Sequence, residues 1–227
     1  MIVKIITTGV IFENCILIFD ENKKEVLVID PGADGDKIEE EIKGYELKGI
    51  LATHGHIDHV GQVGYLKSKF PNAPFYLNEK DTFLINNELF PNFRKLLKAA
   101  ECPKPDILIK EGSTIKFGRF NFYVIETPGH SPGSVCFYDN DYQILITGDT
   151  IFKGSIGRTD LPGGSERDLA LSLQKLLLLP DETQIIPGHG EVSSLKYEKI
   201  YNRDMLELIQ SAKVDIFKDL IKQNNST

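Results

Sequence analysis

The residues best suited to chemistry in this chain are its histidines and the aspartates beside them. Three histidines fall within six residues, with Asp58 among them, and each of the other two follows a Pro-Gly pair. The five histidines are His54, His56, His59, His130 and His189. Imidazole nitrogens and carboxylate oxygens without thiolates suit Zn²⁺, Fe²⁺ or Mn²⁺. The residue types therefore predict a metal site.

The spacing inside the first cluster indicates more than one ion. Histidines at positions i and i+2 of an extended loop point the same way, so His54 and His56 can reach one ion. Asp58 and His59 fall where the next helix is expected to begin, and the helix turns them in another direction. One loop can thus supply ligands to two adjacent ions.

Each histidine lies just beyond an apolar stretch that reads as a strand. The stretches are 47–53, 120–127 and 183–187, and Asp149 follows a fourth one in the same manner. A neighbouring glycine lets the backbone turn sharply at each place. A lone histidine beside a glycine is usually a turn residue, but all five at strand ends favour a shared site.

The remaining chain predicts the elements that must hold these loops. Short apolar or alternating runs indicate strands, and the expected strands are 2–8, 15–20, 25–30, 47–53, 73–77, 106–109, 113–117, 120–127, 134–139, 143–149 and 183–187. Helical spacing is expected over 36–43, 60–69, 79–101 with an interruption at Pro91, 166–179 and 193–222. This order predicts two packed β-sheets with helices outside them, as one domain over 1–227 with a short helical extension at about 193–227.

Composition restricts the class of protein. The 227 residues carry a net charge of −7 without a basic run, which is unfavourable for nucleic-acid binding. No apolar run approaches the roughly 20 residues that span a bilayer, and the start of the chain does not resemble a signal peptide. Three widely spaced cysteines, Cys15, Cys102 and Cys136, fit a reducing compartment, so we expect a cytoplasmic protein.

The motif His54-x-His56-x-Asp58-His59, followed by separated His130, Asp149 and His189, resembles the signature of the metallo-β-lactamase superfamily. The resemblance covers nearly the whole chain. It implies an αββα sandwich of two mixed β-sheets flanked by helices, with the metals at one edge.

The resemblance also implies roles for these residues. By position, His54, His56 and His130 correspond to the ligands of a first metal, and the ligands of a second correspond to Asp58, His59 and His189. Asp149 corresponds to a bridging carboxylate, and the family's catalytic water lies between the two ions. Asp58 is also expected to take part in catalysis. The resemblance implies two divalent ions, with zinc as the expected metal and iron or manganese as alternatives.

The segment 149–164 is similar to the small glyoxalase II-like, or hydroxyacylglutathione hydrolase-like, branch. This implies hydrolysis of a small-molecule thioester such as S-D-lactoylglutathione. Arg158 is expected at the mouth of the site, where it would meet an anionic substrate group or, alternatively, pair with Asp160. Only about forty residues follow His189, too few for the helical domain with which full-length members contact glutathione.

Three other functions remain open on the sequence. A persulfide dioxygenase with a single iron keeps much the same motif, and His54, His130 and Asp149 could serve as its facial triad. A lactonase or other ester hydrolase would use the same site. A purely structural metal site is disfavoured, because such sites normally have four protein ligands and no position for water, whereas seven ligands for two ions leave positions for water.

Overall fold

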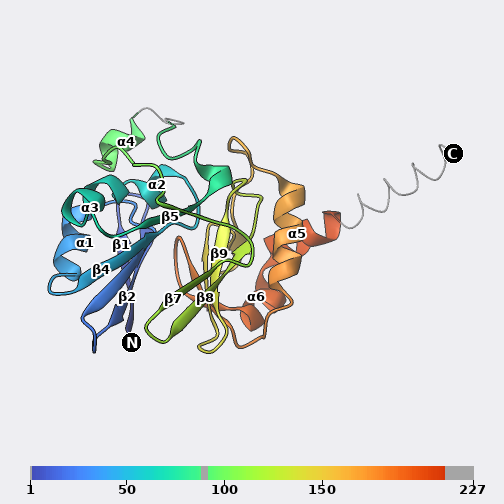
Figure 1. The fold of residues 1–227 in the computed structure, drawn as a ribbon. Coiled ribbons are helices and arrows are strands. Elements are labelled where there is room, and N and C mark those ends of the chain that lie inside the picture. Colours follow the sequence, from blue (N-terminus) through green and yellow to red (C-terminus); the bar gives the residue numbers. More distant parts are fainter. Residues whose placement is uncertain (1, 88–91, 213–227) are drawn as a thin grey trace.

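The computed structural model describes residues 2–87 and 92–212 and consists of two six-stranded sheets packed face to face (Figure 1). The first sheet has the order β1-β2-β3-β4-β5-β6, with β1 (Ile2–Thr8), β2 (Glu13–Asp20), β3 (Glu25–Ile29), β4 (Glu46–Leu51), β5 (Phe75–Asn78) and β6 (Ile107–Ile109). The second has the order β14-β13-β10-β9-β8-β7, with β7 (Thr114–Phe117), β8 (Phe120–Glu126), β9 (Val135–Asp139), β10 (Ile144–Gly148), β13 (Gln184–Pro187) and β14 (Ser193–Ser194).

Both sheets mix parallel and antiparallel pairs, as the family resemblance implies. In the first sheet β1, β2 and β3 are antiparallel neighbours, while β3 to β6 run parallel. In the second, β8, β9 and β10 alternate in direction and β13 is parallel to β10. Strands β8, β10 and β13 therefore run the same way, and their carboxyl ends meet at one edge. A small hairpin of β11 (Ile151–Phe152) and β12 (Ser155–Ile156) follows β10.

Helices cover the outer face of each sheet, which completes the predicted αββα arrangement. In Figure 1, α1 (Gly35–Glu41) and α3 (Val63–Lys69) lie outside the first sheet, and α5 (Glu166–Leu176) and α6 (Leu195–Tyr201) lie outside the second. Helix α5 buries one face, including Leu169, Leu173 and Leu176, at the spacing of an amphipathic helix. Its first turn is capped by Ser165, whose hydroxyl accepts from the backbone N–H of Asp168.

Three hydrophobic clusters correspond to the three interfaces between the layers. One lies between the first sheet and its helices, one between the sheets, and one between the second sheet and its helices. Strand β2 is buried at all eight positions, because both of its faces are covered. Hydrophobic burial at about 25 cal/mol per Å² on both sides of the sheets makes them a rigid support for the loops at their edge.

Several expected helices differ in the structure. The helix expected over 60–69 is two helices, α2 (Ile57–Val60) and α3, separated at Gly61 and Gln62. Over 79–101 the described residues form only the 3₁₀ turn Glu79–Asp81 and α4 (Phe93–Leu96), and 88–91 lie outside the described residues. Asn86 instead joins this segment to Cys102, since its side chain donates to the Cys102 carbonyl and accepts from the Cys102 amide.

The extension expected to be helical from 193 begins instead with β14, and α6 starts at Leu195. Ser194 ends the strand and caps α6 by accepting from the backbone N–H of Tyr197. The chain is helical again over 203–212, after a break at Asn202, and 213–227 lie outside the described residues. Leu195, Met205 and Ile209 belong to the cluster beneath the second sheet, so the described part of the extension packs on the domain.

No helix within the described ranges is long and apolar enough to cross a membrane. The three cysteines are buried free thiols.

Candidate metal centre and active site

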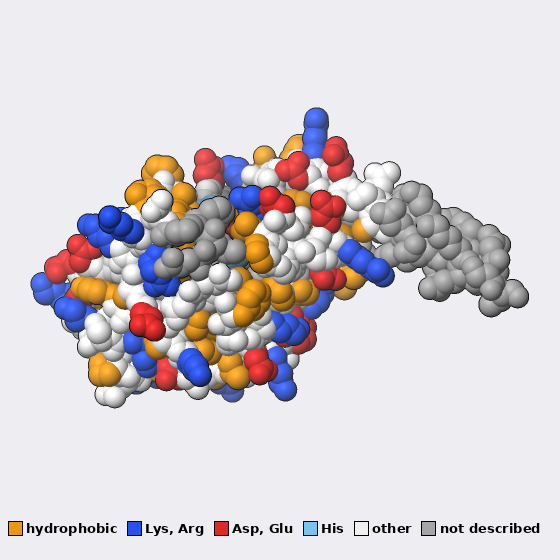
Figure 2. All heavy atoms as spheres, turned by 90° about the horizontal axis from the view of Figure 1, so that it is seen from above, with side chains coloured by type: hydrophobic (Ala, Val, Ile, Leu, Met, Phe, Trp, Pro, Cys, Tyr) orange, Lys and Arg blue, Asp and Glu red, His pale blue; other side chains and the backbone are white. Residues whose placement is uncertain are grey.

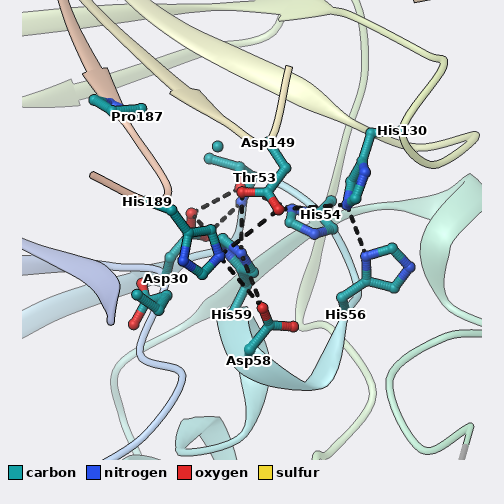
Figure 3. Close-up of polar contacts among 12 residues, drawn as sticks. Asp30, Thr53, His54, His56, Asp58, His59, His130, Asp149, Pro187 and His189 are labelled. Carbon is teal, nitrogen blue, oxygen red and sulfur yellow. Dashed lines mark hydrogen bonds and ion pairs between the residues drawn. The ribbon is translucent and has the colours of Figure 1, made fainter. Parts of the chain in front are cut away.

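All seven residues predicted from the motif come together at the edge where the strands end (Figure 3). His54 and His56 follow β4, His130 follows β8, Asp149 follows β10, and His189 follows β13. Asp58 and His59 lie in α2, whose N-cap is His56. The short helix turns these last two side chains away from the loop direction, as the spacing predicts.

The side chains form overlapping groups whose ligand atoms lie within 4.8 Å of one another, and two of these groups share no residue. One group is His54, His56 and His130, and the other is Asp58, His59 and His189. In the first, His56 Nδ1 and His130 Nε2 are 2.9 Å apart. In the second, Asp58 Oδ2 lies 3.4 Å from His189 Nε2 and 3.6 Å from His59 Nε2.

Asp149 lies between the two groups. Its Oδ1 is 3.3 Å from His59 Nε2, and its Oδ2 is 3.5 Å from His130 Nε2. One carboxylate oxygen thus faces each group, which is the arrangement that a bridging ligand requires. The role of Asp149 as a bridging ligand, which the family resemblance implies, stays a prediction.

Four of the histidines have a hydrogen bond at the ring nitrogen that faces away from the site, and in His54 this bond joins Nδ1 to Thr53 Oγ1 at 3.2 Å. His130 Nδ1 donates to the carbonyl of Arg158 at 2.8 Å, and His189 Nδ1 donates to the carbonyl of Ile11 at 3.2 Å. His59 Nδ1 donates to Asp30 Oδ2 at 3.0 Å. Each of these bonds directs Nε2 at the site, where it is the atom that would bind a metal, as in metal-ligating histidines.

The side chains fit a divalent cation. His54 Nε2, His59 Nε2 and Asp149 Oδ1 are buried and have no hydrogen-bond partner in the described structure. A buried polar atom without a partner costs about 1–3 kcal/mol, and these three lie within 4.8 Å of one another, so a cation between them would give each of them a partner. Nitrogen and oxygen donors without sulfur match zinc, iron or manganese.

The surroundings shift the pKa values of the histidines in opposite directions. Burial lowers the pKa of His54 well below its usual value, and burial together with His130 lowers that of His56 to about 4. Burial also disfavours charge on His59, but Asp149, Asp30 and Asp58 outweigh it and raise its pKa well above the ordinary value. Burial works to raise the pKa of Asp149, but the neighbouring His59, His130 and His189 outweigh burial and lower that pKa. The ionised carboxylates therefore favour a proton on His59, and a bound cation would take the place of that proton, because metal ligands must be deprotonated.

The structure adds residues that the sequence reasoning missed. Asp30 lies in a left-handed turn with φ +53° and accepts hydrogen bonds from the Thr53 amide and hydroxyl and from His59. Its signal was present, because Asp30-Pro31-Gly32 follows the apolar strand β3 as the predicted ligands follow theirs. Asp81 joins the loop of Gly55 to the loop of Ser131 and had no such signal.

Arg158 lines the cavity beside the site, and its guanidinium and its backbone carbonyl bind different partners. Its guanidinium makes a two-point ion pair with Asp160, at 2.6 and 2.7 Å, and its carbonyl accepts from His130. The structure therefore contains the ion pair that was one of the two alternatives for this residue.

A layered sandwich with convergent histidines and aspartates at its open edge defines a class of metal-binding hydrolases. Residues 8–189 match the family described as Metallo-beta-lactamase superfamily, and the chain belongs to this superfamily.

Relatives and solved structures agree with this membership. The chain is 37% identical over 206 residues to a protein of Haemophilus influenzae named hydroxyacylglutathione hydrolase GloC, covering 89% of this chain and 97% of the relative. It superposes on the B3 metallo-beta-lactamase BLEG-1 with a TM-score of 0.82 at 32% identity, covering 90% and 99% of the two chains. It superposes on TTHA1623, solved in a di-iron-bound form, with a TM-score of 0.79 at 36% identity, covering 88% and 98%.

Proposed function

We propose that this chain is a thioester hydrolase that holds two divalent metal ions. The observation that carries the proposal is the pair of ligand groups joined by Asp149, with Asp58 exposed to a cavity beside them. Two ions held there would orient a water molecule, lower its pKa and stabilise the oxyanion that forms on a carbonyl. The similarity to the protein named GloC supports a glutathione thioester such as S-D-lactoylglutathione as substrate.

In this proposal Asp58 moves a proton. Its Oδ2 contacts His189 and His59, whereas its Oδ1 makes no hydrogen bond or ion pair among the described residues. Burial works against ionisation of Asp58, but His59 and His189 lower its pKa, so the carboxylate is available as a base. Oδ1 accepts a proton as the water oxygen bonds to the thioester carbonyl carbon. The carbon–sulfur bond then breaks, and the leaving thiolate takes up the proton that Asp58 accepted, which restores the carboxylate.

The second ligand group supports a site for two ions rather than one. Asp58, His59 and His189 lie within 4.8 Å of one another and offer ligands for a second ion, in addition to the His54, His130 and Asp149 that a mononuclear iron site would use. The neighbour solved in a di-iron-bound form also supports a two-metal site. We propose zinc as the metal, with iron or manganese suited to the same ligands.

Hydrolysis of S-D-lactoylglutathione and related thioesters by metal-loaded protein tests the proposal, with His54→Ala as the inactive comparison. Elemental analysis of protein purified without added metal accompanies it. Two ions per chain and turnover of a thioester are the expected results. One iron per chain with oxygen uptake on glutathione persulfide would instead establish the dioxygenase, and turnover of lactones alone would establish a lactonase.

A further inference from the structure

A cavity of about 570 Å³ opens beside the metal ligands, and its walls are mostly hydrophobic. His56, Asp58, His130 and Asp149 line it on the side of the predicted metals. Its hydrophobic lining consists of Ile11, Ile57, Leu84, Phe93, Leu96 and Leu161. Pockets of this size and character bind small molecules through apolar contact with a few oriented polar groups.

These hydrophobic walls come from separate parts of the chain. Ile11 lies in the turn between β1 and β2, Leu96 in α4, and Leu161 in the segment after β12. Ile11 is 39% and Leu96 56% exposed, and next to Ile11 the side chain of Phe12 is 70% exposed. Figure 2, which views this side of the molecule from above, shows hydrophobic side chains gathered at its surface among charged ones. Exposed apolar surface grouped at a cavity marks a binding site.

Both arginines among the described residues that line the cavity already have partners. The guanidinium of Arg158 pairs with Asp160. That of Arg94 donates to the carbonyl of Ala100 and to Asn86 Oδ1. The lactoyl group is small and carries a hydroxyl, so it would leave most of the hydrophobic wall in contact with water. A larger apolar group would cover this wall, at about 0.8 kcal/mol for each methylene removed from water.

We infer that the cavity binds the acyl group of the substrate and that this group is an apolar chain or ring. This inference rests on the proposed thioesterase function and names its substrate class. The thiols that carry acyl groups, such as glutathione, are polar or charged, so the apolar part of such a thioester is its acyl group. The polar thiol then extends toward the mouth, where Arg158 lies.

The test is a series of glutathione thioesters that differ only in the acyl group: acetyl, butanoyl, hexanoyl, octanoyl and D-lactoyl. Because one buried methylene corresponds to about a fourfold change in kcat/KM, hexanoyl thioester should exceed D-lactoyl thioester by well over tenfold. A flat profile, or a preference for the D-lactoyl group, overturns the inference while leaving the thioesterase function intact.

Two substitutions of the same kind locate the effect. Leu161→Asn should lower kcat/KM for the hexanoyl thioester about tenfold more than for the acetyl thioester. Leu178 is 86% exposed, follows α5 and does not line the cavity, so Leu178→Asn should leave both values unchanged. Equal effects of Leu161→Asn on both thioesters would overturn the inference.

Binding separates this inference from the proposed function. S-alkylglutathiones of the same chain lengths cannot be hydrolysed, and calorimetry on metal-loaded protein measures their affinity. If no thioester is hydrolysed, the proposed function fails. Affinity that increases with chain length would still support an apolar-group site, and affinity independent of chain length would overturn it.

Discussion

The carboxylate of Asp81 accepts a hydrogen bond from the hydroxyl of Ser131 at 2.6 Å, and Ser131 follows the ligand His130 directly. The same carboxylate accepts from the backbone N–H of Gly55 at 2.9 Å, between His54 and His56, and from that of Gly133 at 2.6 Å. Asp81 thus joins the two loops that supply the first ligand group, although it is not itself a ligand.

Asp81→Asn should therefore weaken metal binding without touching a ligand. The amide nitrogen of asparagine donates where the carboxylate accepts, so one of these bonds is lost and the loops separate. Loss of a residue that orients metal ligands typically lowers affinity by about 10–100-fold. Chelator competition measures this change. Asp106→Asn is the matched control, because Asp106 accepts from Lys67 and the Phe75 amide away from the site. Equal affinities in the two variants would contradict the assignment.

The clustering of the expected metal ligands was predictable from the sequence, because the loops that carry them follow apolar strands and have a glycine nearby. The residues that orient them were harder to predict, since their partners are determined by packing of distant segments. Arg158 supports His130 through its carbonyl, and a backbone atom leaves no trace in residue type. Asp81 lies in a 3₁₀ turn within a segment whose spacing suggested a longer helix. Side-chain and backbone contacts in three dimensions override local periodicity there.

The strands were predicted more accurately than the helices, because the residue pattern of a buried strand is less ambiguous. Short apolar runs such as 15–20 and 134–139 have few alternatives to a buried strand, and β2 and β9 are found there. Pairing partners did not follow from the runs themselves. Strand β6 joins the first sheet, although the next strand along the chain, β7, belongs to the second.

Gly188→Ala should lower metal content by steric interference alone. A Cβ atom at Gly188 would lie 2.4 Å from Asp149 Oδ1 and 2.7 Å from His59 Cε1, so both ligands would have to move. Elemental analysis should show a loss of bound metal, alongside a drop of about 1–3 kcal/mol in the free energy of unfolding. Gly112→Ala provides the comparison: it lies in open space at φ +77°, so it should cost stability while metal content stays normal. Full metal content in Gly188→Ala would refute this prediction.

Acid should destabilise the metal-free protein partly through His56. Its pKa falls from 6.5 to about 4 on folding, so the unfolded chain binds the extra proton first. Stability from this residue is present above pH 6.5 and is lost as the pH falls toward 4, by at most about 3 kcal/mol. Urea unfolding of metal-free protein at several pH values measures the slope. His56→Asn should show a flatter dependence between pH 4 and 6.5, and identical slopes would contradict the prediction.

The cysteines should be unreactive in the folded protein. Burial raises the pKa of Cys15 well above its usual value, that of Cys136 to about 11 and that of Cys102 to about 12. Since the thiolate is the reactive form, alkylation at pH 8 should be negligible in native protein. In denaturant, mass spectrometry should find all three thiols modified. Rapid labelling of any one of them in native protein would show that its surroundings open.

Substitutions of Arg158 and Asp160 should change the KM for the substrate in opposite directions. If Arg158 contacts an anionic group of the thiol, Arg158→Ala should raise the KM of a glutathione thioester by about twofold to fivefold, as expected for an exposed ion pair. Asp160→Asn should lower the KM, because it frees the guanidinium from its two-point partner. The value of kcat should change little in either variant, since His130 is held by the backbone carbonyl of Arg158. Both effects should weaken at 1 M salt, where the Debye length is about 3 Å. If both substitutions raise the KM alike, the ion pair is structural and Arg158 has no contact with the substrate.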